Sequence, residues 1–174
     1  MNPDAAADWE TRIAAVWKIA DALTPQELVR TVDALASERP ADDPHALFER
    51  ACARDTAGIE HGAEPLYRAA LASGALDTYR HARASIQLAS TLRHLGRLDE
   101  SEALLLAQLE RCRAEGPGAA LHDEVRSVLA FTWVAQGRAV EAASLALETL
   151  APHLSRYQRS TAANARALRR HQVD

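Results

Sequence analysis

The feature that most constrains the fold is a pair of apolar-striped runs joined by Gly-Arg, a pattern that occurs twice. The first copy covers Arg83–Leu109 and the second covers Arg126–Leu150. On both sides of each Gly-Arg pair, apolar residues recur every three or four positions, which is the periodicity of an amphipathic helix. When Gly96 is placed on Gly137, the matched positions are Leu88 with Leu129, Ala89 with Ala130, Leu92 with Trp133, Ser101 with Ala142 and Leu105 with Ala146. The chain is therefore expected to contain repeated helix–turn–helix units.

The composition agrees with an all-α protein. Of the 174 residues 48% are hydrophobic but only 5% are aromatic, and much of the apolar content is alanine, the best helix former. The seven glycines and seven prolines lie mostly between the periodic runs. The net charge of −4 is mild and excludes no class of partner.

Start and stop signals predict four helices before the first clear copy of the pattern. An apolar stripe runs over residues 9–23, and Thr24-Pro25-Gln26-Glu27 has the form of a capping box that opens a second helix. That helix should end before Pro40, and Asp43-Pro44 should open a third by the same logic. The fourth helix stops at Gly74, and Pro65 within it is expected to delay its start or bend it.

The later half of the chain predicts five more helices. The first two run from about 77 to 95 and from 98 to 114, the third follows the 115–123 connector and ends at 136, the fourth runs from 139 to 150, and the last begins at about Ser155. Gln158 would complete a capping box at the start of that last helix. Ala146 stands where a large ring is common, so a neighbouring side chain is expected to fill the space beside it.

Whole segments, and not only their spacing, resemble a known family. The segments are ALFERACARDTAG (Ala46–Gly58), PLYRAAL (Pro65–Leu71), IQLASTLRHLGR (Ile86–Arg97) and parts of Ala146–Ser160. They are similar to small bacterial tetratricopeptide repeat (TPR) proteins, a family of unassigned function. One departure is Arg54, which stands where an aromatic residue or leucine is usual.

The resemblance implies an all-α, tetratricopeptide-like solenoid of helical hairpins, a right-handed superhelix of about nine helices. It covers a single domain, 1–174. We expect an N-terminal hairpin cap at 1–40, repeats at 43–74, 78–114 and 119–151, and a C-terminal capping helix at 152–171. The implied role is non-enzymatic protein–protein interaction or scaffolding.

Motifs for chemistry do not occur in the sequence. There is no phosphate-binding loop, dinucleotide fingerprint, zinc-protease motif or nucleophile elbow. None of the seven histidines pairs with another His or Cys at helical spacing, so we expect no metal, no cofactor and no enzymatic activity. Cys52 and Cys112 are expected to be free, buried or half-buried thiols. Since neither a secretory signal nor a membrane-length apolar run occurs, a cytoplasmic protein without membrane partners is expected.

The first helix of each pair should line the concave surface of such an array. The peptide-binding candidates on these helices are His45, Phe48, Cys52, Asp55, Arg83, Gln87, Ser90, Arg93, His94, Glu124, Ser127, Phe131 and Val134. The centre of this set is polar and basic, and arginine suits bidentate binding of carboxylates. An acidic peptide or a C-terminal carboxylate is therefore the specific hypothesis, and an ordinary solvated helix face is the alternative.

A second candidate surface is the last helix, which carries five arginines on one side. They are Arg156, Arg159, Arg166, Arg169 and Arg170, with Leu154, Tyr157, Ala165 and Leu168 expected on the apolar side. The favoured interpretation is a capping helix with a solvated outer face. The alternatives are a basic surface for nucleic acid or an acidic partner, and self-association of the chain into a structural assembly or homo-oligomer.

Overall fold

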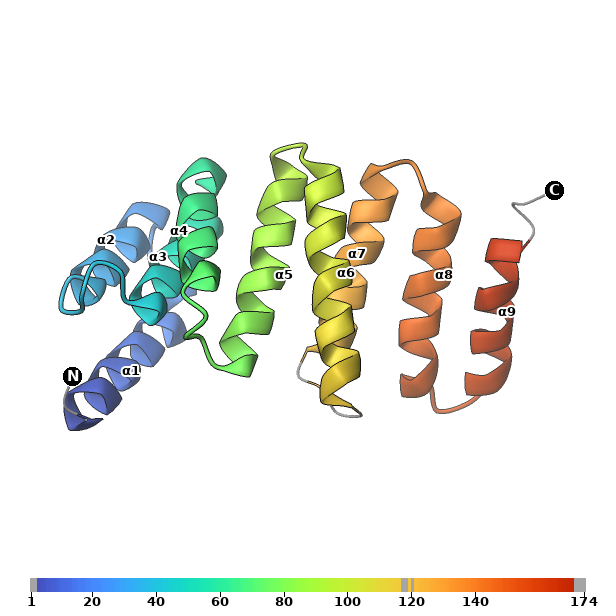
Figure 1. The fold of residues 1–174 in the computed structure, drawn as a ribbon, viewed down its shortest axis with the longest axis horizontal. Coiled ribbons are helices and arrows are strands. Elements are labelled where there is room, and N and C mark those ends of the chain that lie inside the picture. Colours follow the sequence, from blue (N-terminus) through green and yellow to red (C-terminus); the bar gives the residue numbers. More distant parts are fainter. Residues whose placement is uncertain (1–2, 117–118, 120, 171–174) are drawn as a thin grey trace. The chain divides into compact units, whose positions relative to one another are not determined.

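The computed structural model describes residues 3–116, 119 and 121–170. Within these residues it contains nine α-helices and two short 3-10 turns, without a strand (Figure 1). The predicted all-α fold of a helical repeat protein is thus confirmed. The chain divides into two compact units, Met1–Thr91 and Leu92–Asp174, and each is described by itself. The finer division into a cap, three repeats and a terminal helix stays a prediction.

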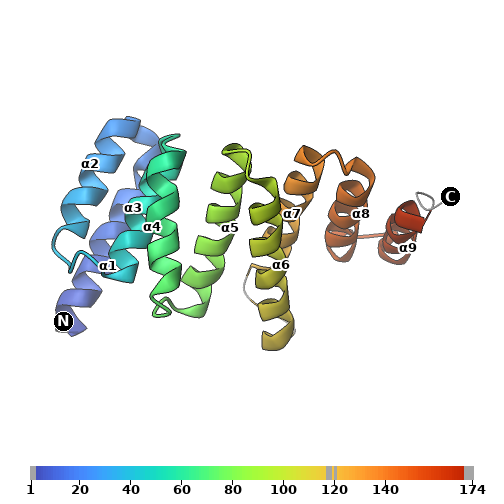
Figure 2. The same cartoon turned by 45° about the horizontal axis from the view of Figure 1, so that its top comes forward.

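The first unit consists of four helices and most of a fifth. They are α1 (Pro3–Lys18), α2 (Pro25–Ala36), α3 (Pro44–Thr56), α4 (Glu60–Ala72) and α5 (Thr78–His94), of which α5 belongs to this unit as far as Thr91. A 3-10 turn, Ala20–Ala22, follows α1. Successive helices α1 to α4 pack on one another, and Figure 2 shows α3 and α4 side by side.

The two helix starts that cap-and-proline signals predicted in this unit, those of α2 and α3, are confirmed. The hydroxyl of Thr24 accepts the backbone N–H of Glu27 at 3.3 Å, and the Glu27 carboxylate accepts the N–H of Thr24 at 2.9 Å. The Asp43 carboxylate accepts the N–H groups of His45 and Ala46, at 3.0 and 2.9 Å. In both cases a proline takes the first helical position, where its missing N–H costs nothing.

The apolar stripe of α1 forms the core of the α1–α2 hairpin. Trp9 and Ile13 are buried together with Val32 of α2, and the Trp9 indole N–H donates to the carbonyl of Leu35 at 2.8 Å. Arg54 of α3 ties this hairpin to the next. Its guanidinium donates to both carboxylate oxygens of Asp33 on α2, at 2.9 and 2.8 Å. The arginine that departs from the repeat pattern is therefore a bidentate link between helices.

The second unit contains α6 (Leu98–Glu115), α7 (His122–Ala135), α8 (Ala139–Leu150) and α9 (Gln158–Arg170), with a 3-10 turn at Ala151–His153. Neighbouring helices in this series pack on one another. Leu105, Val125 and Leu129 are buried among them. Inside this core the hydroxyls of Ser101 and Thr132 lie 3.0 Å apart and satisfy one another. No helix in the described ranges is long and apolar enough to cross a membrane.

Trp133 is the largest side chain buried on α7, with 9% of its surface exposed. Its indole N–H donates to Glu102 of α6 at 2.6 Å. The same carboxylate accepts from Gln136 at 2.9 Å and from Arg138 at 2.7 Å, and the Arg138 guanidinium lies 4.6 Å from the indole ring. Trp133 therefore packs at the end of α7 under a polar cluster that links α6 to the turn before α8.

The three glycine turns share one geometry. Gly58, Gly96 and Gly137 have φ values of +70°, +75° and +81°, which glycine adopts without a side-chain penalty. After each glycine, the next backbone N–H reaches back five residues to a carbonyl in the preceding helix, at 2.8, 2.9 and 2.8 Å. The repeat seen in the sequence is thus a repeat of backbone hydrogen bonds.

The start of α9 differs from the expected one, and of the two effects expected of Pro65 in α4 a delayed helix start is wrong. α4 begins at Glu60 and carries Pro65 inside it. The bond that this proline cannot make would end at His61, which is exposed at the helix start and accessible to water. α9 begins at Gln158 and not near Ser155, because the side chain of Gln158 donates to the carbonyls of Pro152 and Leu154, at 2.9 and 2.8 Å. Gln158 thus caps the preceding 3-10 turn.

Candidate functional site

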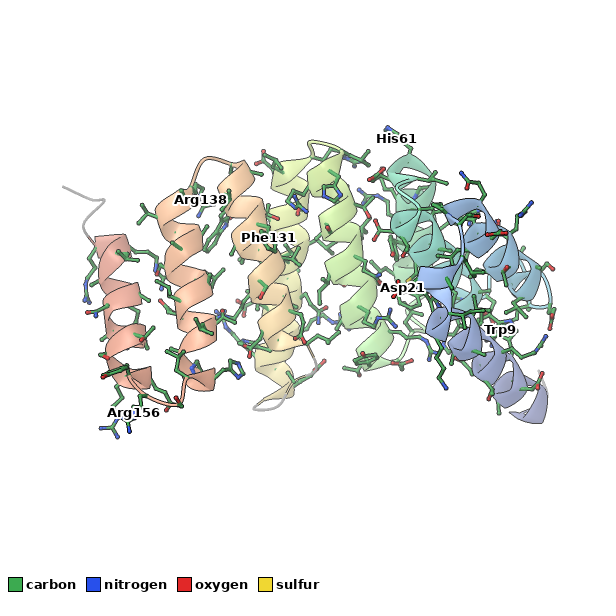
Figure 3. The ribbon with its side chains drawn as sticks, turned by 180° about the vertical axis from the view of Figure 1, so that it is seen from behind. Trp9, Asp21, His61, Phe131, Arg138 and Arg156 are labelled. Carbon is green, nitrogen blue, oxygen red and sulfur yellow. The ribbon has the colours of Figure 1, made fainter. Side chains whose placement is uncertain are left out.

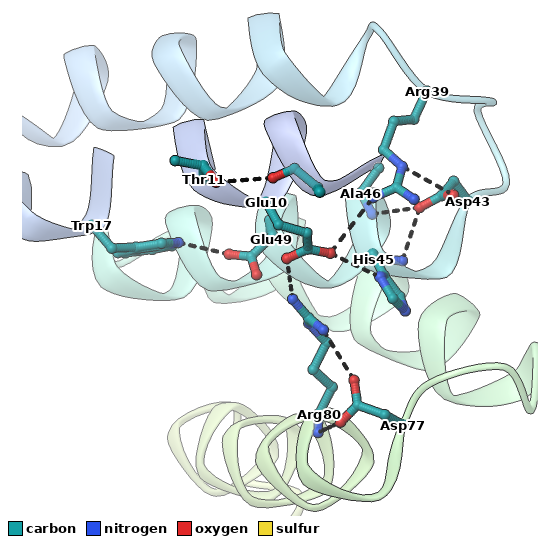
Figure 4. Close-up of polar contacts among 11 residues, drawn as sticks. Glu10, Thr11, Trp17, Arg39, Asp43, His45, Ala46, Glu49, Asp77 and Arg80 are labelled. Carbon is teal, nitrogen blue, oxygen red and sulfur yellow. Dashed lines mark hydrogen bonds and ion pairs between the residues drawn. The ribbon is translucent and has the colours of Figure 1, made fainter. Parts of the chain in front are cut away.

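A charged pocket of about 470 Å³ lies among α1, α3 and α5 of the first unit. Its lining combines apolar and charged side chains: Glu10, Ile13, Ala14, Trp17, Lys18, Glu49, Arg80 and Arg83. We call it the α1/α3/α5 pocket. Figure 4 shows the polar contacts on one side of it.

Glu10 lies close to three basic side chains, Arg80, His45 and Arg39. It pairs with Arg80, and its other oxygen lies 3.1 Å from the imidazole of His45 and 3.8 Å from the guanidinium of Arg39 (Figure 4). Arg80 also donates to Asp77 at 3.0 Å. The charges of Glu10 and Arg80 are thus used within the protein.

Glu49 is an acid in an apolar setting. Its residue surface is 4% exposed, and one carboxylate oxygen accepts the indole N–H of Trp17 at 2.6 Å. Burial raises the pKa of Glu49 more than the Trp17 hydrogen bond and the charges of Arg83 and Arg80 lower it. Glu49 was not among the residues predicted from the sequence. A signal exists in its helical spacing, since Ala46, Cys52 and Ala53 lie three or four positions away and are all buried.

Arg83 and Lys18 are two further cations that line the pocket. The Arg83 guanidinium lies 5.1 Å from the ring centre of Phe48 and 6.0 Å from that of Tyr79. Among the residues that the structure describes, neither the Arg83 nor the Lys18 side chain has a hydrogen-bond or ion-pair partner. Two positive charges are therefore left for a group from outside.

Two first-unit candidates from the sequence, Phe48 and Cys52, are buried. Phe48 is fully buried, so its predicted position on a binding surface was wrong. Its ring centre lies 6.3 Å from that of Tyr67, and the Arg83 guanidinium lies over the Phe48 ring. Cys52 is also buried, and its thiol donates to Gln87 at 3.3 Å. Burial raises the pKa of Cys52 to about 12. The helix face predicted as one surface thus divides into a buried and an exposed part.

The remaining first-unit candidates are half-buried. Asp55 accepts hydrogen bonds from the hydroxyls of Tyr67 and Thr91, at 3.5 and 3.0 Å, so its carboxylate is used within the unit. Ser90 is half-buried on α5. His45 stands beside Glu10 at the edge of the α1/α3/α5 pocket. The structure therefore brings His45 and Arg83 to one region, and gives Asp55 and Gln87 internal partners.

The second-unit candidates lie around an exposed phenylalanine. Phe131 is 61% exposed, and the Arg93 guanidinium lies 5.9 Å from its ring centre. Arg93 also approaches the exposed His94, with 2.9 Å between their side-chain nitrogens. Ser127 is exposed and donates to the carbonyl of Asp123 at 2.8 Å. Glu124 and Val134 are exposed on the same helix.

The arginines of the C-terminal region do not form one helical face. Arg156 precedes α9, Arg169 pairs with Glu148 of α8, and Arg159, Arg166 and Arg170 are exposed on α9. On the opposite side, Ala165 is buried as expected, but Tyr157 is 76% exposed and its expected packing was wrong. The backbone at Tyr157 turns with a positive φ before α9 begins, so its side chain leaves the helix face.

The possible metal ligands and the two cysteines are also candidates for a site among the described residues. No group of three or more His, Cys, Asp or Glu side chains in residues 3–116, 119 and 121–170 could hold a metal ion. Cys52 and Cys112 are both free and buried, as predicted.

The comparisons with known proteins agree with the hairpin geometry. No curated protein and no solved structure matches the sequence. One family model, described as tetratrico peptide repeat, matches residues 44–168, which begins at α3 and ends within α9. This match spans most of the chain and includes all three glycine turns. The chain therefore belongs to the tetratricopeptide repeat family.

Proposed function

We propose that this chain is a protein–protein interaction module that binds the carboxylate of an acidic peptide in the α1/α3/α5 pocket. Repeats of this family serve protein–protein interaction or scaffolding in general. The observation that carries the proposal is Arg83, a half-buried guanidinium without a hydrogen-bond or ion-pair partner in the described residues, lying over two aromatic rings at the wall of a pocket.

The geometry around Arg83 suits a carboxylate. Contacts with the Phe48 and Tyr79 rings restrict the guanidinium, so less conformational entropy is lost when it forms a two-pronged bond with a ligand. Lys18 adds a second positive charge at the pocket wall. An acidic ligand side chain or a peptide C-terminus would both satisfy this pair of cations.

Glu49 and Trp17 define what else the ligand must offer. One carboxylate oxygen of Glu49 already accepts the indole N–H of Trp17, and the charges of Arg83 and Arg80 act on the same carboxylate. Trp17 and Ile13 supply apolar surface in the same pocket. We therefore expect a ligand with an apolar side chain next to its carboxylate.

The test is fluorescence anisotropy with three sets of dye-labelled peptides. One set carries acidic side chains and an amidated C-terminus, one carries apolar residues and a free C-terminal carboxylate, and one is neutral and amidated. We expect binding of the first or second set and none of the third, with affinity falling as salt rises. Comparing the first two sets identifies the source of the carboxylate.

Arg83→Gln is the decisive variant. Loss of a desolvated charge contact at an interface costs about 2 kcal/mol or more, so binding should weaken by roughly 30-fold. Arg30→Gln is the matched control, because Arg30 is an exposed arginine on α2 and its loss changes the net charge equally. Unchanged binding by Arg83→Gln would refute the pocket, and equal losses in both variants would indicate a non-specific charge effect.

Two further variants test the other surfaces that the sequence suggested. Arg93→Ala alters the face around Phe131, and Arg159→Ala alters the start of α9. Both should bind the peptides as the unchanged protein does. Loss of binding in Arg93→Ala alone would move the site to the surface around Phe131, and loss in Arg159→Ala alone would move it to the C-terminal arginines.

A further inference from the structure

Tyr157 holds an aromatic ring in solvent at an energetic cost. It is 76% exposed, and its φ of +67° lies in the left-handed region that non-glycine residues rarely adopt. Arg156 and Arg159 on either side of it are exposed, and neither has an ion-pair partner among the described residues. Figure 3 shows Arg156 pointing outward from the α8–α9 turn. An exposed ring in a strained turn between two free cations suggests a contact with another molecule.

A complementary hollow lies on the same unit. A pocket of about 450 Å³ is formed by α7 and α8, with the exposed side chains of Phe131 and Leu150 at its walls and Ala130 and Ala146 in its lining. We expected a neighbour to fill the space beside Ala146. Ala146 is instead exposed in the described part of the chain, so this space is open. Its apolar lining and its phenylalanine suit an aromatic ring.

The rim of this pocket carries negative charge. Asp123 and Glu124 both line it. Asp123 is engaged by His122 at 3.1 Å and His153 at 2.9 Å, whereas Glu124 is exposed and has no partner among the described residues. Glu124 and Phe131 lie seven residues apart on α7, about 10 Å along the helix axis. An aromatic residue with an adjacent arginine can therefore meet both.

We propose that two copies of this chain form a dimer in which Tyr157 of each copy inserts into the α7/α8 pocket of the other, with Arg156 pairing with Glu124. The ring and the pocket belong to one end of one hairpin, because His153 lines the pocket and Tyr157 follows it by four residues. A surface that carries both halves of a contact is self-complementary and closes as a two-fold dimer. The contact is small, so a Kd of about 10–100 µM is expected.

Sedimentation velocity at protein concentrations from about 1 µM to about 1 mM tests the dimer, because this range includes the expected Kd. The full chain should pass from monomer to dimer and no further. Tyr157→Gly should remain monomeric throughout, although glycine relieves the positive φ. Its melting temperature, measured where the unchanged protein is monomeric, should therefore not fall. Phe131→Ser should also be monomeric and folded, since Phe131 is exposed.

Mixing the two variants tests the pairing itself. Tyr157→Gly keeps an intact pocket and Phe131→Ser keeps an intact ring, so the mixture should regain one of the two contacts and form a weaker dimer. Glu124→Arg should abolish the dimer, and adding Arg156→Glu to it should restore it. A chain that stays monomeric up to 1 mM, a dimer that survives Tyr157→Gly, or a mixture without dimer would each overturn the proposal. Growth beyond the dimer would overturn its two-fold symmetry.

Discussion

Replacing Trp133 by alanine is the strongest test of the packing in the second unit. The indole is 9% exposed, and deleting a buried tryptophan side chain typically costs 3–5 kcal/mol. The change also removes the contact between the ring and the Arg138 guanidinium, which contributes about 0.5–1 kcal/mol. The change does not leave the Glu102 carboxylate without hydrogen bonds, because Gln136 and Arg138 still donate to it. We therefore expect a loss of about 4 kcal/mol.

Urea denaturation followed by far-ultraviolet circular dichroism measures this loss as a lower midpoint at unchanged slope. Trp133→Phe is the matched control. It keeps an aromatic ring at the site but removes the indole N–H that bonds to Glu102 and part of the buried ring volume, so it should cost roughly 1–2 kcal/mol, less than Trp133→Ala. A loss below about 1 kcal/mol for Trp133→Ala would mean that the side chain is not packed between helices and that the register of α7 is wrong.

The remaining predictions concern a turn and an ion pair. Gly137→Ala should lower the free energy of unfolding by about 1 kcal/mol through its positive φ alone, because an added Cβ meets no atom within 4 Å; a melt unchanged from that of the parent protein would contradict this. Burial would raise the pKa of Asp33, but hydrogen bonds from Arg54 and Arg50 outweigh it and the pKa is lowered. A carboxyl group whose pKa is lower in the folded than in the unfolded state stabilises the fold at pH values above its unfolded pKa. This stabilisation is lost as the pH falls through its folded pKa. Asp33→Asn should therefore cost roughly 1 kcal/mol near pH 7 and progressively less below about pH 4 in urea melts, and a gap that widens in acid would contradict the assignment.

The elements that the sequence predicted well are encoded within a few residues. The Thr24–Glu27 capping box and the glycine turns each depend on contacts between residues three to five positions apart, so their residue types alone identify them. The start of α9 was wrong because Gln158 serves a 3-10 turn that periodicity does not reveal. Local signals therefore predict the presence of a helix better than the residues at which it starts and ends.

The candidate site could be predicted only in part. Arg83 was predicted from its position on the helix. That it forms no ion pair in the described residues depends on which partners the neighbouring charged side chains have. Glu49 bonds to Trp17, which lies 32 positions earlier, and Arg80 pairs with Glu10, 70 positions earlier. Helical periodicity carries no information on such distant contacts. Phe48 was assigned to the surface for the same reason, since its burial comes from Tyr67 and Arg83 on other helices.

The bidentate link between Arg54 and Asp33 has a consequence for shortening the chain. The family match begins at residue 44, which suggests that residues 1–40 could be removed without harm to the repeats. Such a truncation would take away Asp33 and leave Arg50 and Arg54 close together without their shared carboxylate. It would also uncover Ala46 and Ala53, which are buried with the residues of α1 and α2. The α1–α2 hairpin thus stabilises α3, and the shortened protein should be prone to unfolding and aggregation.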